Sequence, residues 1–360
     1  MKFLTPRLLR SVFATRPVAM RPVDGRPVDG RPVAVLAGAA LCMATLSGCA
    51  VRAQRSHEPG PAGAHAVAHA ATRAVVPAGA EDAALRRKLE AVTNGFHGNV
   101  GIYVRNLRTG ATVAIAADDT FPTASIVKIP LLITLFDQAR LGTVNLDSLY
   151  TLTDSTIIQN DGDDAFAPAQ LGTKMEPRRM AYLMMSLSDN TASVWIQTLI
   201  GGSQVANAWL EQHGYAVTRD NSRVAERRPL HRRWGWGMTS PREIASLLVS
   251  IRSGEVISPD ISEELYRFMT RSYWREEALS AIPADVQVAS KQGAVNASRS
   301  EVLLVHAPAG DYVLSVLTKN NEDQRWVHDN EAYIMIRRVS WTVYNHFNPD
   351  DPWRPEWLRR

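Results

Sequence analysis

Strand-like segments lie at both ends of the globular part of this chain, and helix-like segments fill its middle. Short stretches with strand character occur at 99–107, 111–117, 286–293, 301–307 and 312–319. Apolar residues recur with helical spacing at 81–93, 126–141, 177–186, 191–200, 203–213, 241–253 and 330–345. Strands that are separated by so many helices must pair across the whole domain. We therefore predict an α+β fold in which N- and C-terminal strands form one antiparallel sheet, helices flank it, and an all-helical subdomain is inserted.

The composition is sufficient for a hydrophobic core and gives no indication of nucleic-acid binding. The chain has 360 residues, of which 45% are hydrophobic and 21% charged, which is enough to bury at least one full core. The formal charge of +4 comes partly from arginines near the two ends. We therefore expect no nucleic-acid partner.

The N-terminus has the character of an export signal. Several arginines precede an apolar stretch at 33–46 that is too short to span a bilayer comfortably. The following Leu-Ser-Gly-Cys at 46–49 looks like a bacterial lipobox, in which Cys49 would become lipidated. Cys42 would leave with the signal, so no disulfide framework is expected. We predict an exported lipoprotein, at the periplasmic face of a membrane or at the cell surface.

These features divide the chain into four parts. Residues 1–48 are the predicted signal peptide, 49–80 a flexible tether, 81–348 the folded domain and 349–360 a C-terminal tail. The tether carries His57, His65 and His69, which we interpret as solvated side chains rather than metal ligands. We expect a monomer without a metal or organic cofactor.

Three short motifs occur in order within the folded domain. They are Ser-Ile-Val-Lys at 125–128, Ser-Asp-Asn at 188–190 and Lys-Gln-Gly at 291–293. Each alone is a weak signal, but all three at domain-scale spacing form a strong one. The set resembles the Ser-x-x-Lys, Ser-Asp-Asn and Lys-Thr-Gly signature of class A β-lactamases and their penicillin-binding relatives.

The first motif supplies a nucleophile and a base. A serine hydroxyl becomes a good nucleophile only when a neighbouring group removes its proton. Lys128 lies at i+3 from Ser125, and burial would favour its neutral, proton-accepting form. The alternative is an ordinary helix start in which Ser125 caps the helix and Lys128 is exposed.

The resemblance implies roles for the other residues. Ser188 would relay a proton to the leaving group, and Asn190 would bind Lys128 and the substrate amide. Lys291 would contribute positive charge, Gly293 would let the substrate approach, and the backbone N–H groups of Ser125 and Ala294 would bind the oxyanion. As alternatives, Ser188 or Asp189 caps a helix and Lys291 is a surface lysine.

Arg299 has two possible partners. Its planar guanidinium could bind a substrate carboxylate or form an ion pair with Glu301. The sequence favours neither.

Two departures from the family pattern concern turnover and affinity. The glutamate that activates the deacylating water in class A enzymes has no clean counterpart, because Glu226 lies two residues past the expected place. Glu226 is a candidate base, but the sequence favours an exposed side chain paired with Arg227 or Arg228. Gln292 replaces the usual Thr or Ser that binds a substrate carboxylate. The Trp-Gly-Trp-Gly segment at 234–237 forms either an aromatic wall or part of the core.

We therefore predict a β-lactamase-type serine hydrolase that acylates Ser125 with β-lactams or related amides and esters. Two alternatives remain open. One is a D-alanyl-D-alanine peptidase or esterase on the same fold, and the other is a lipoprotein that binds penicillin without turnover.

Overall fold

The structure, a computed structural model, describes residues 79–159 and 169–359. The predicted signal peptide, the lipobox with Cys49, almost all of the tether and its three histidines lie outside the described residues. Within the described part, no helix is long and apolar enough to cross a membrane.

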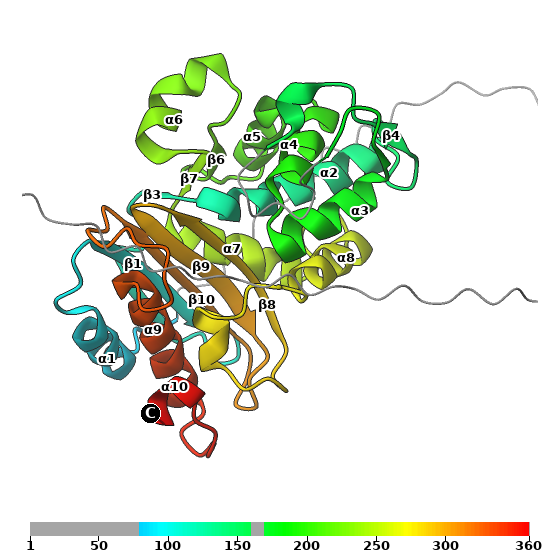
Figure 1. The fold of residues 1–360 in the computed structure, drawn as a ribbon. Coiled ribbons are helices and arrows are strands. Elements are labelled where there is room, and N and C mark those ends of the chain that lie inside the picture. Colours follow the sequence, from blue (N-terminus) through cyan, green and yellow to red (C-terminus); the bar gives the residue numbers. More distant parts are fainter. Residues whose placement is uncertain (1–78, 160–168, 360) are drawn as a thin grey trace, which may run out of the picture. The chain divides into compact units, whose positions relative to one another are not determined.

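A five-stranded antiparallel sheet joins the two ends of the domain (Figure 1). Its spatial order is β2-β1-β10-β9-β8, so a C-terminal strand pairs directly with the first strand. Asn99 of β1 lies opposite Lys319 of β10, and Asn106 lies opposite Tyr312. The strands are β1 (Asn99–Asn106), β2 (Thr112–Ile115), β8 (Val288–Val295), β9 (Ser298–Val305) and β10 (Tyr312–Lys319). The predicted α+β architecture is confirmed.

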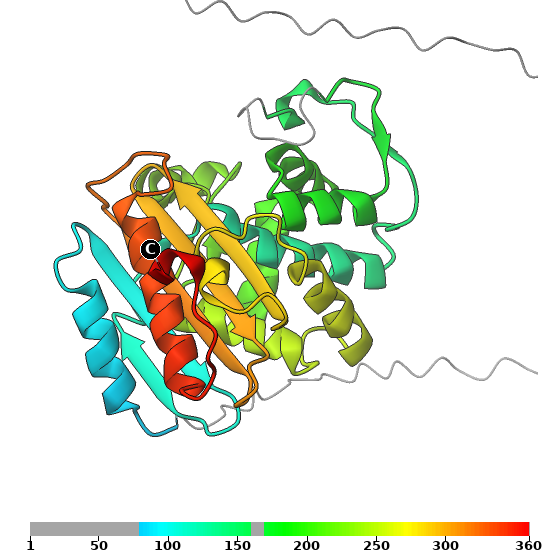
Figure 2. The same ribbon diagram turned by 60° about the horizontal axis from the view of Figure 1, so that its bottom comes forward.

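One face of the sheet is covered by the terminal helices α1 (Ala83–Thr93) and α9 (Glu331–Phe347), which lie side by side in Figures 1 and 2. Leu85 and Leu89 of α1 are buried against apolar residues of α9 and of the sheet. Asn330 begins α9 by accepting a hydrogen bond from the Ala332 N–H through its side chain, which is the usual role of a helix N-cap. Helices from opposite ends of the chain therefore close the same core.

The other face carries α7 (Pro241–Arg252) and, beyond it, a group of helices. This group consists of α2 (Lys128–Arg140), α3 (Pro177–Tyr182), α4 (Asn190–Leu199), α5 (Ser203–Gln212) and α8 (Pro259–Met269). Residues 128–136 of α2 are all buried, as expected of a helix surrounded by other elements. Helix α2 is therefore the centre of the inserted subdomain.

Short elements connect these layers. They are β3 (Phe121–Pro122), η1 (Ala124–Val127), β4 (Tyr150–Thr151), η2 (Ser155–Ile157), β5 (Lys174–Met175), η3 (Leu183–Leu187), β6 (Arg219–Asp220), η4 (Ala225–Arg227), α6 (Arg228–Trp234), β7 (Gly237–Thr239), η5 (Ala278–Ala281) and α10 (Glu356–Arg359).

Two parts differ from the secondary structure expected from sequence. Helix α8 has a strong apolar face but was not predicted; Ser258 caps it and Pro259 occupies its first turn. The C-terminal segment packs on α9: the Trp353 and Trp341 rings lie 5.8 Å apart, and the Tyr344 hydroxyl donates to Asp351 at 2.5 Å.

Candidate active site

Ser125 and Lys128 lie where a tight turn becomes helix α2. Residues 124–127 form a 3₁₀ helix, η1, in which side chains at i and i+3 eclipse each other. The Lys128 Nζ consequently lies 3.0 Å from the Ser125 Oγ. The N-cap positions of η1 and α2 are occupied by Thr123 and Val127 rather than by Ser125, and Lys128 is fully buried, so neither residue has the ordinary helix-start role.

The Lys128 amino group is surrounded by oxygen atoms. Besides Ser125, its Nζ contacts the Asn190 Oδ1 at 2.7 Å, the Ser188 Oγ at 3.1 Å and the Ser188 backbone carbonyl. The Trp236 ring lies over it at 5.8 Å. A buried amine with this many polar neighbours can hold and transfer a proton without access to bulk water.

Ser188 projects from the short turn between two helices. The π-helix η3 ends at Ser188, whose φ of +64° places it in the left-handed region. The next residue, Asp189, is the N-cap of α4 and accepts the Ala192 N–H at 2.7 Å. The two sequence interpretations of this motif hold together: Asp189 caps the helix, and Ser188 faces Lys128.

Lys291 approaches the same hydroxyl from the edge strand β8. Its Nζ donates to the Ser188 Oγ at 3.0 Å, and to the carbonyl and the Oε1 of Gln292, both at 2.9 Å. The side chain is fully buried, so Lys291 is not a surface lysine. Burial, and then the nearby charge of Lys128, hold the pKa of Lys291 well below its ordinary value.

Two glutamates lie near Lys291 and oppose this lowering of its pKa. Both Glu301 and Glu277 favour the charged form of the lysine. Burial, and then Glu277, raise the pKa of the Glu301 carboxyl to about 8. Glu301 also accepts the Ala278 N–H at 2.9 Å, which ties β9 to η5.

Gly293 lets strand β8 approach the nucleophile turn. A Cβ at this position would lie 2.4 Å from the Thr123 carbonyl oxygen and 3.1 Å from the Ser125 nitrogen. Only glycine permits this contact between β8 and η1. The strand and the serine are therefore held in register by backbone approach.

A cavity of about 1050 Å³ opens above these groups. Ser125, Ser188, Asn190, Gln292, Gly293 and Ala294 line it together with an aromatic rim of Trp234, Trp236, Trp274, Trp326 and Tyr333. Trp234 and Trp236 thus form a wall of the cavity rather than part of the core. Among the residues described, no group of acids, histidines or cysteines has the geometry of a metal site.

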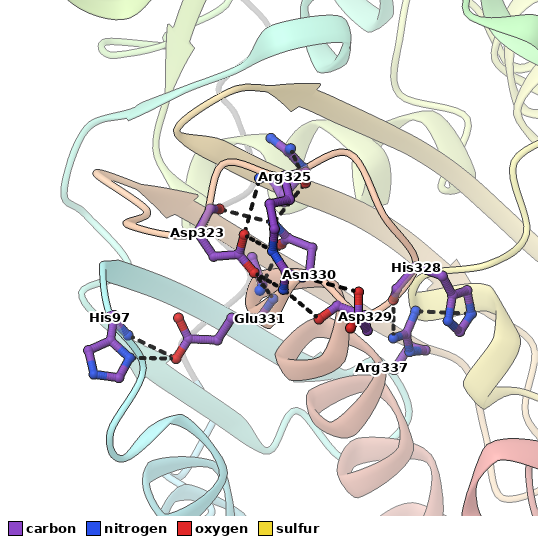
Figure 3. Close-up of polar contacts among 10 residues, drawn as sticks. His97, Asp323, Arg325, His328, Asp329, Asn330, Glu331 and Arg337 are labelled. Carbon is purple, nitrogen blue, oxygen red and sulfur yellow. Dashed lines mark hydrogen bonds and ion pairs between the residues drawn. The ribbon is translucent and has the colours of Figure 1, made fainter. Parts of the chain in front are cut away.

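One side of the cavity is a loop held by its own polar contacts (Figure 3). Asp323 accepts hydrogen bonds from the Arg325 side chain and from the Glu331 N–H. Arg337 of α9 donates to the His328 carbonyl at 2.7 Å. These contacts fix the backbone that presents Trp326 and His328 to the cavity.

The structure does not bring Arg299 to the cavity lining. Its side chain is buried and donates to backbone carbonyls of the 295–298 turn. Its Cζ lies 4.2 Å from the centre of the Trp326 ring. Among the described residues it forms no ion pair with Glu301, and its guanidinium instead supports the turn and the Trp326 wall.

Glu226 is also outside the cavity lining. It lies exposed on η4, and no ion pair to Arg227 or Arg228 occurs in the part of the chain that the structure describes. Arg227 instead donates to the Asn221 Oδ1 at 2.9 Å. The fold thus leaves the one glutamate of this loop in solvent.

Sequence reasoning missed the acidic and aromatic groups beyond β8. Glu276, Glu277, Trp326 and Arg337 line the cavity, although none belongs to a recognisable motif. The sequence signal was indirect: Glu301 directly precedes the apolar run 302–305, and an acid buried there must find a partner.

The chain is similar in sequence to known β-lactamases. The model of the "Beta-lactamase enzyme family" matches residues 84–347. Beta-lactamase 3 of Bacillus cereus is 25% identical over 231 residues, 63% of this chain and 72% of that protein. A beta-lactamase of Mycobacterium tuberculosis is 27% identical over 250 residues, 68% of this chain and 79% of that protein.

Solved structures give the same result. PBP-A is 25% identical and superimposes with a TM-score of 0.67, covering 76% of this chain and 99% of that one. A mutant of PBP-A, solved as an acyl-enzyme complex with penicillin G, has the same identity and TM-score.

We predict that Gly293→Ala separates β8 from the nucleophile turn. The added methyl group would collide with the Thr123 carbonyl, so the strand must move. Acylation should slow by about 10²-fold, as expected for a displacement of about 1 Å among reacting groups. Stopped-flow measurement of acylation gives the rate. Val288→Ala, on the same strand but outside the catalytic cavity, is the control, and a Gly293→Ala protein with the wild-type rate would contradict the argument.

We predict that Glu301→Gln makes stability less dependent on pH. Because the Glu301 pKa is raised from 4.5 to about 8, the folded state holds a proton that the unfolded state has lost between these values. Wild-type stability should therefore fall as pH rises through this window. Glutamine does not titrate. As pH rises through this window, the free energy of unfolding of the variant should therefore increase relative to that of wild type by on the order of 1 kcal/mol per pH unit.

Urea unfolding between pH 5 and 8.5 measures this difference. The exposed Glu263→Gln serves as the control, and its curve should parallel that of wild type. Equal pH dependence of the wild-type and Glu301→Gln proteins would show that Glu301 does not titrate in this range.

Proposed function

Because the chain belongs to the beta-lactamase enzyme family, we propose that it is a serine hydrolase whose Ser125 forms an acyl-enzyme with β-lactams or related amides and esters. One observation carries the proposal: the buried Lys128 Nζ lies within 3.1 Å of the Ser125 Oγ, the Ser188 Oγ and the Asn190 Oδ1. This arrangement connects a nucleophile, a base and a proton carrier.

The contacts of Lys128 suit a neutral amine. A neutral amine has two N–H groups and one lone pair. The Ser188 carbonyl and the Asn190 Oδ1 only accept hydrogen bonds, so they engage the two N–H groups. A lone pair directed at the Ser125 Oγ, 3.0 Å away, would accept the hydroxyl proton, and Lys128 would act as the base for Ser125.

The contacts of Lys291 suit an ammonium. Its Nζ has three acceptors, the Ser188 Oγ and two oxygens of Gln292, which match three N–H groups. Because the Ser188 oxygen accepts from Lys291, its own proton can pass toward the leaving group. The proton taken from Ser125 by Lys128 then replaces it.

The tetrahedral intermediate needs donors for its oxyanion. The backbone N–H groups of Ser125 and Ala294 are the pair that the family resemblance assigns, and the close approach of Gly293 to Ser125 supports this assignment. The half-buried Gln292 side chain faces a substrate carboxylate in place of a hydroxyl.

Fewer residues of the site support hydrolysis of the acyl-enzyme than support its formation. Glu226 is exposed and does not line the cavity, which favours slow deacylation. This observation supports the second candidate function, a D-alanyl-D-alanine peptidase or esterase, and a penicillin-binding protein without turnover is its extreme case.

We further propose that residues 1–48 are a lipoprotein signal, that Cys49 anchors the protein to a membrane, and that 49–80 tether the domain 81–348. The apolar segment before a Leu-Ser-Gly-Cys sequence supports this. Labelled palmitate should enter the full-length protein and not the Cys49→Ala variant. Equal labelling of the two proteins would show that Cys49 is not the lipid anchor.

The proposed function predicts a covalent adduct at Ser125. Intact-mass spectrometry of the protein with penicillin G should show an increase of one penicillin mass. Ser125→Ala should lose the adduct with nearly unchanged thermal midpoint, whereas the exposed Ser155→Ala should keep it. An adduct on Ser125→Ala would remove Ser125 as nucleophile.

Glu226→Gln should leave the deacylation rate within about threefold of wild type. An exposed glutamate outside the cavity cannot position the attacking water, whereas a true general base contributes about 10²–10⁴-fold. Adduct decay after removal of excess penicillin measures the rate. A long-lived variant adduct beside a rapidly cleared wild-type adduct would make Glu226 the base.

A further inference from the structure

A second cavity of about 1030 Å³ adjoins the catalytic one. Its walls are the segment 270–276, the segment 279–288 that leads into β8, and the C-terminal segment with Trp353 and Trp357. Glu276 and His328 line both cavities. The two spaces therefore meet at these residues.

The combined volume of the two cavities exceeds what a small substrate requires. Sites for drug-sized ligands occupy about 300–1000 Å³, and the catalytic cavity alone is already of that order. A β-lactam bound at Ser125 would leave the second cavity empty. An extended chain would enter it.

Hydrogen-bond donors without acceptors line the second cavity. Arg271 and Arg275 are exposed, and the described residues give neither of them an ion pair or a hydrogen bond. The Trp357 Nε1 is buried and has no partner among those residues. Arginine forks bind carboxylates through paired, charge-assisted hydrogen bonds, so these donors fit an acidic ligand.

The remaining charged groups leave the cavity positive. Arg354 lies over the Trp341 ring at 5.3 Å and donates to nearby carbonyls. Glu276 and Glu356 are the lining acids. Three arginines against two glutamates give a formal charge of +1.

The position along β8 indicates which part of a substrate would lie there. The proposed oxyanion donor Ala294 is near the end of β8, Lys291 lies three residues earlier beside Ser188, and residues 286–288 lie earlier still. The segment 270–276 also docks on the Ser188 turn, since the Trp274 Nε1 donates to the Leu187 carbonyl at 2.9 Å. The second cavity is thus on the side of Ser188, the proton donor to the leaving group.

We propose that this cavity is a subsite for the leaving-group part of an acidic peptide, with Arg271 and Arg275 binding its carboxylates. The proposal rests on the proposed function. In the reaction, the Ser125 oxygen bonds to the acyl carbon, the C–N bond breaks, and the amine leaves with a proton from Ser188. The released amine is then the N-terminus of a peptide that extends past Glu276 and His328.

The test measures binding without turnover. The full-length Ser125→Ala protein is titrated calorimetrically with N-acetyl-D-Ala-Gly-Glu-Glu and with its neutral counterpart N-acetyl-D-Ala-Gly-Gln-Gln. The acidic peptide should bind about tenfold more tightly, as expected for charge-assisted contacts to two arginines. Adding Arg271→Ala and Arg275→Ala should reduce this ratio to about one.

A matched control removes two exposed arginines that line neither cavity. Arg87→Ala with Arg338→Ala, in the same Ser125→Ala protein, should keep the tenfold ratio. Equal affinity for the two peptides, failure of both to bind, or a ratio that survives loss of Arg271 and Arg275 would overturn the subsite.

Penicillin separates this result from the proposed function. Arg271→Ala/Arg275→Ala with Ser125 intact should acylate at the wild-type rate, because a β-lactam does not reach the cavity. A wild-type protein that forms no penicillin adduct while its Ser125→Ala form still prefers the acidic peptide would refute the reaction and keep the subsite.

Discussion

The burial of two lysines against one hydroxyl is the constraint on which the site depends. Lys128 and Lys291 are both fully buried, and each contacts the Ser188 Oγ. Two ammonium groups in a desolvated site repel each other, and the cost of burying each charge is large. A difference in protonation would relieve this repulsion: the Ser188 carbonyl and the Asn190 Oδ1 suit a neutral Lys128, and the three acceptors of Lys291 would hold an ammonium against the lowering of its pKa by burial.

The fold brings the two lysines together from different elements. Lys128 begins α2, the buried helix of the inserted subdomain, and Lys291 lies on the edge strand of the sheet. Neither half alone contains the pair. Gly293 lets β8 touch the Ser125 turn through backbone atoms, and the left-handed Ser188 brings a third element to the same point. The antiparallel pairing of the chain ends supports this junction because β10 lies between β1 and β9.

The sequence predicted the parts of the site that are local and patterned. Ser125 and Lys128 are three residues apart, and the other two motifs have fixed spacing, so their convergence followed from the resemblance. The contacts of Arg299 could not be predicted from sequence, because nearness to Glu301 along the chain does not decide its partner. Residues 299 and 301 lie two apart on one strand, yet Arg299 turns to the carbonyls of its own hairpin and Glu301 to the Ala278 N–H. The partner of each side chain depends on which unpaired backbone groups lie near it, and only the folded chain determines which groups these are.

Helix α8 and the C-terminal segment show a second limit of sequence reasoning. The segment 349–360 contains three prolines and no helical period, which suits the predicted tail, but Trp353 packs against Trp341 of α9 and Asp351 accepts the Tyr344 hydroxyl. Aromatic packing of this kind has no sequence periodicity to reveal it. It nevertheless builds one wall of a cavity that meets the catalytic one. In this protein, therefore, the residues of the proposed acyl transfer are marked by sequence motifs, whereas those of the proposed leaving-group subsite are brought together by tertiary packing.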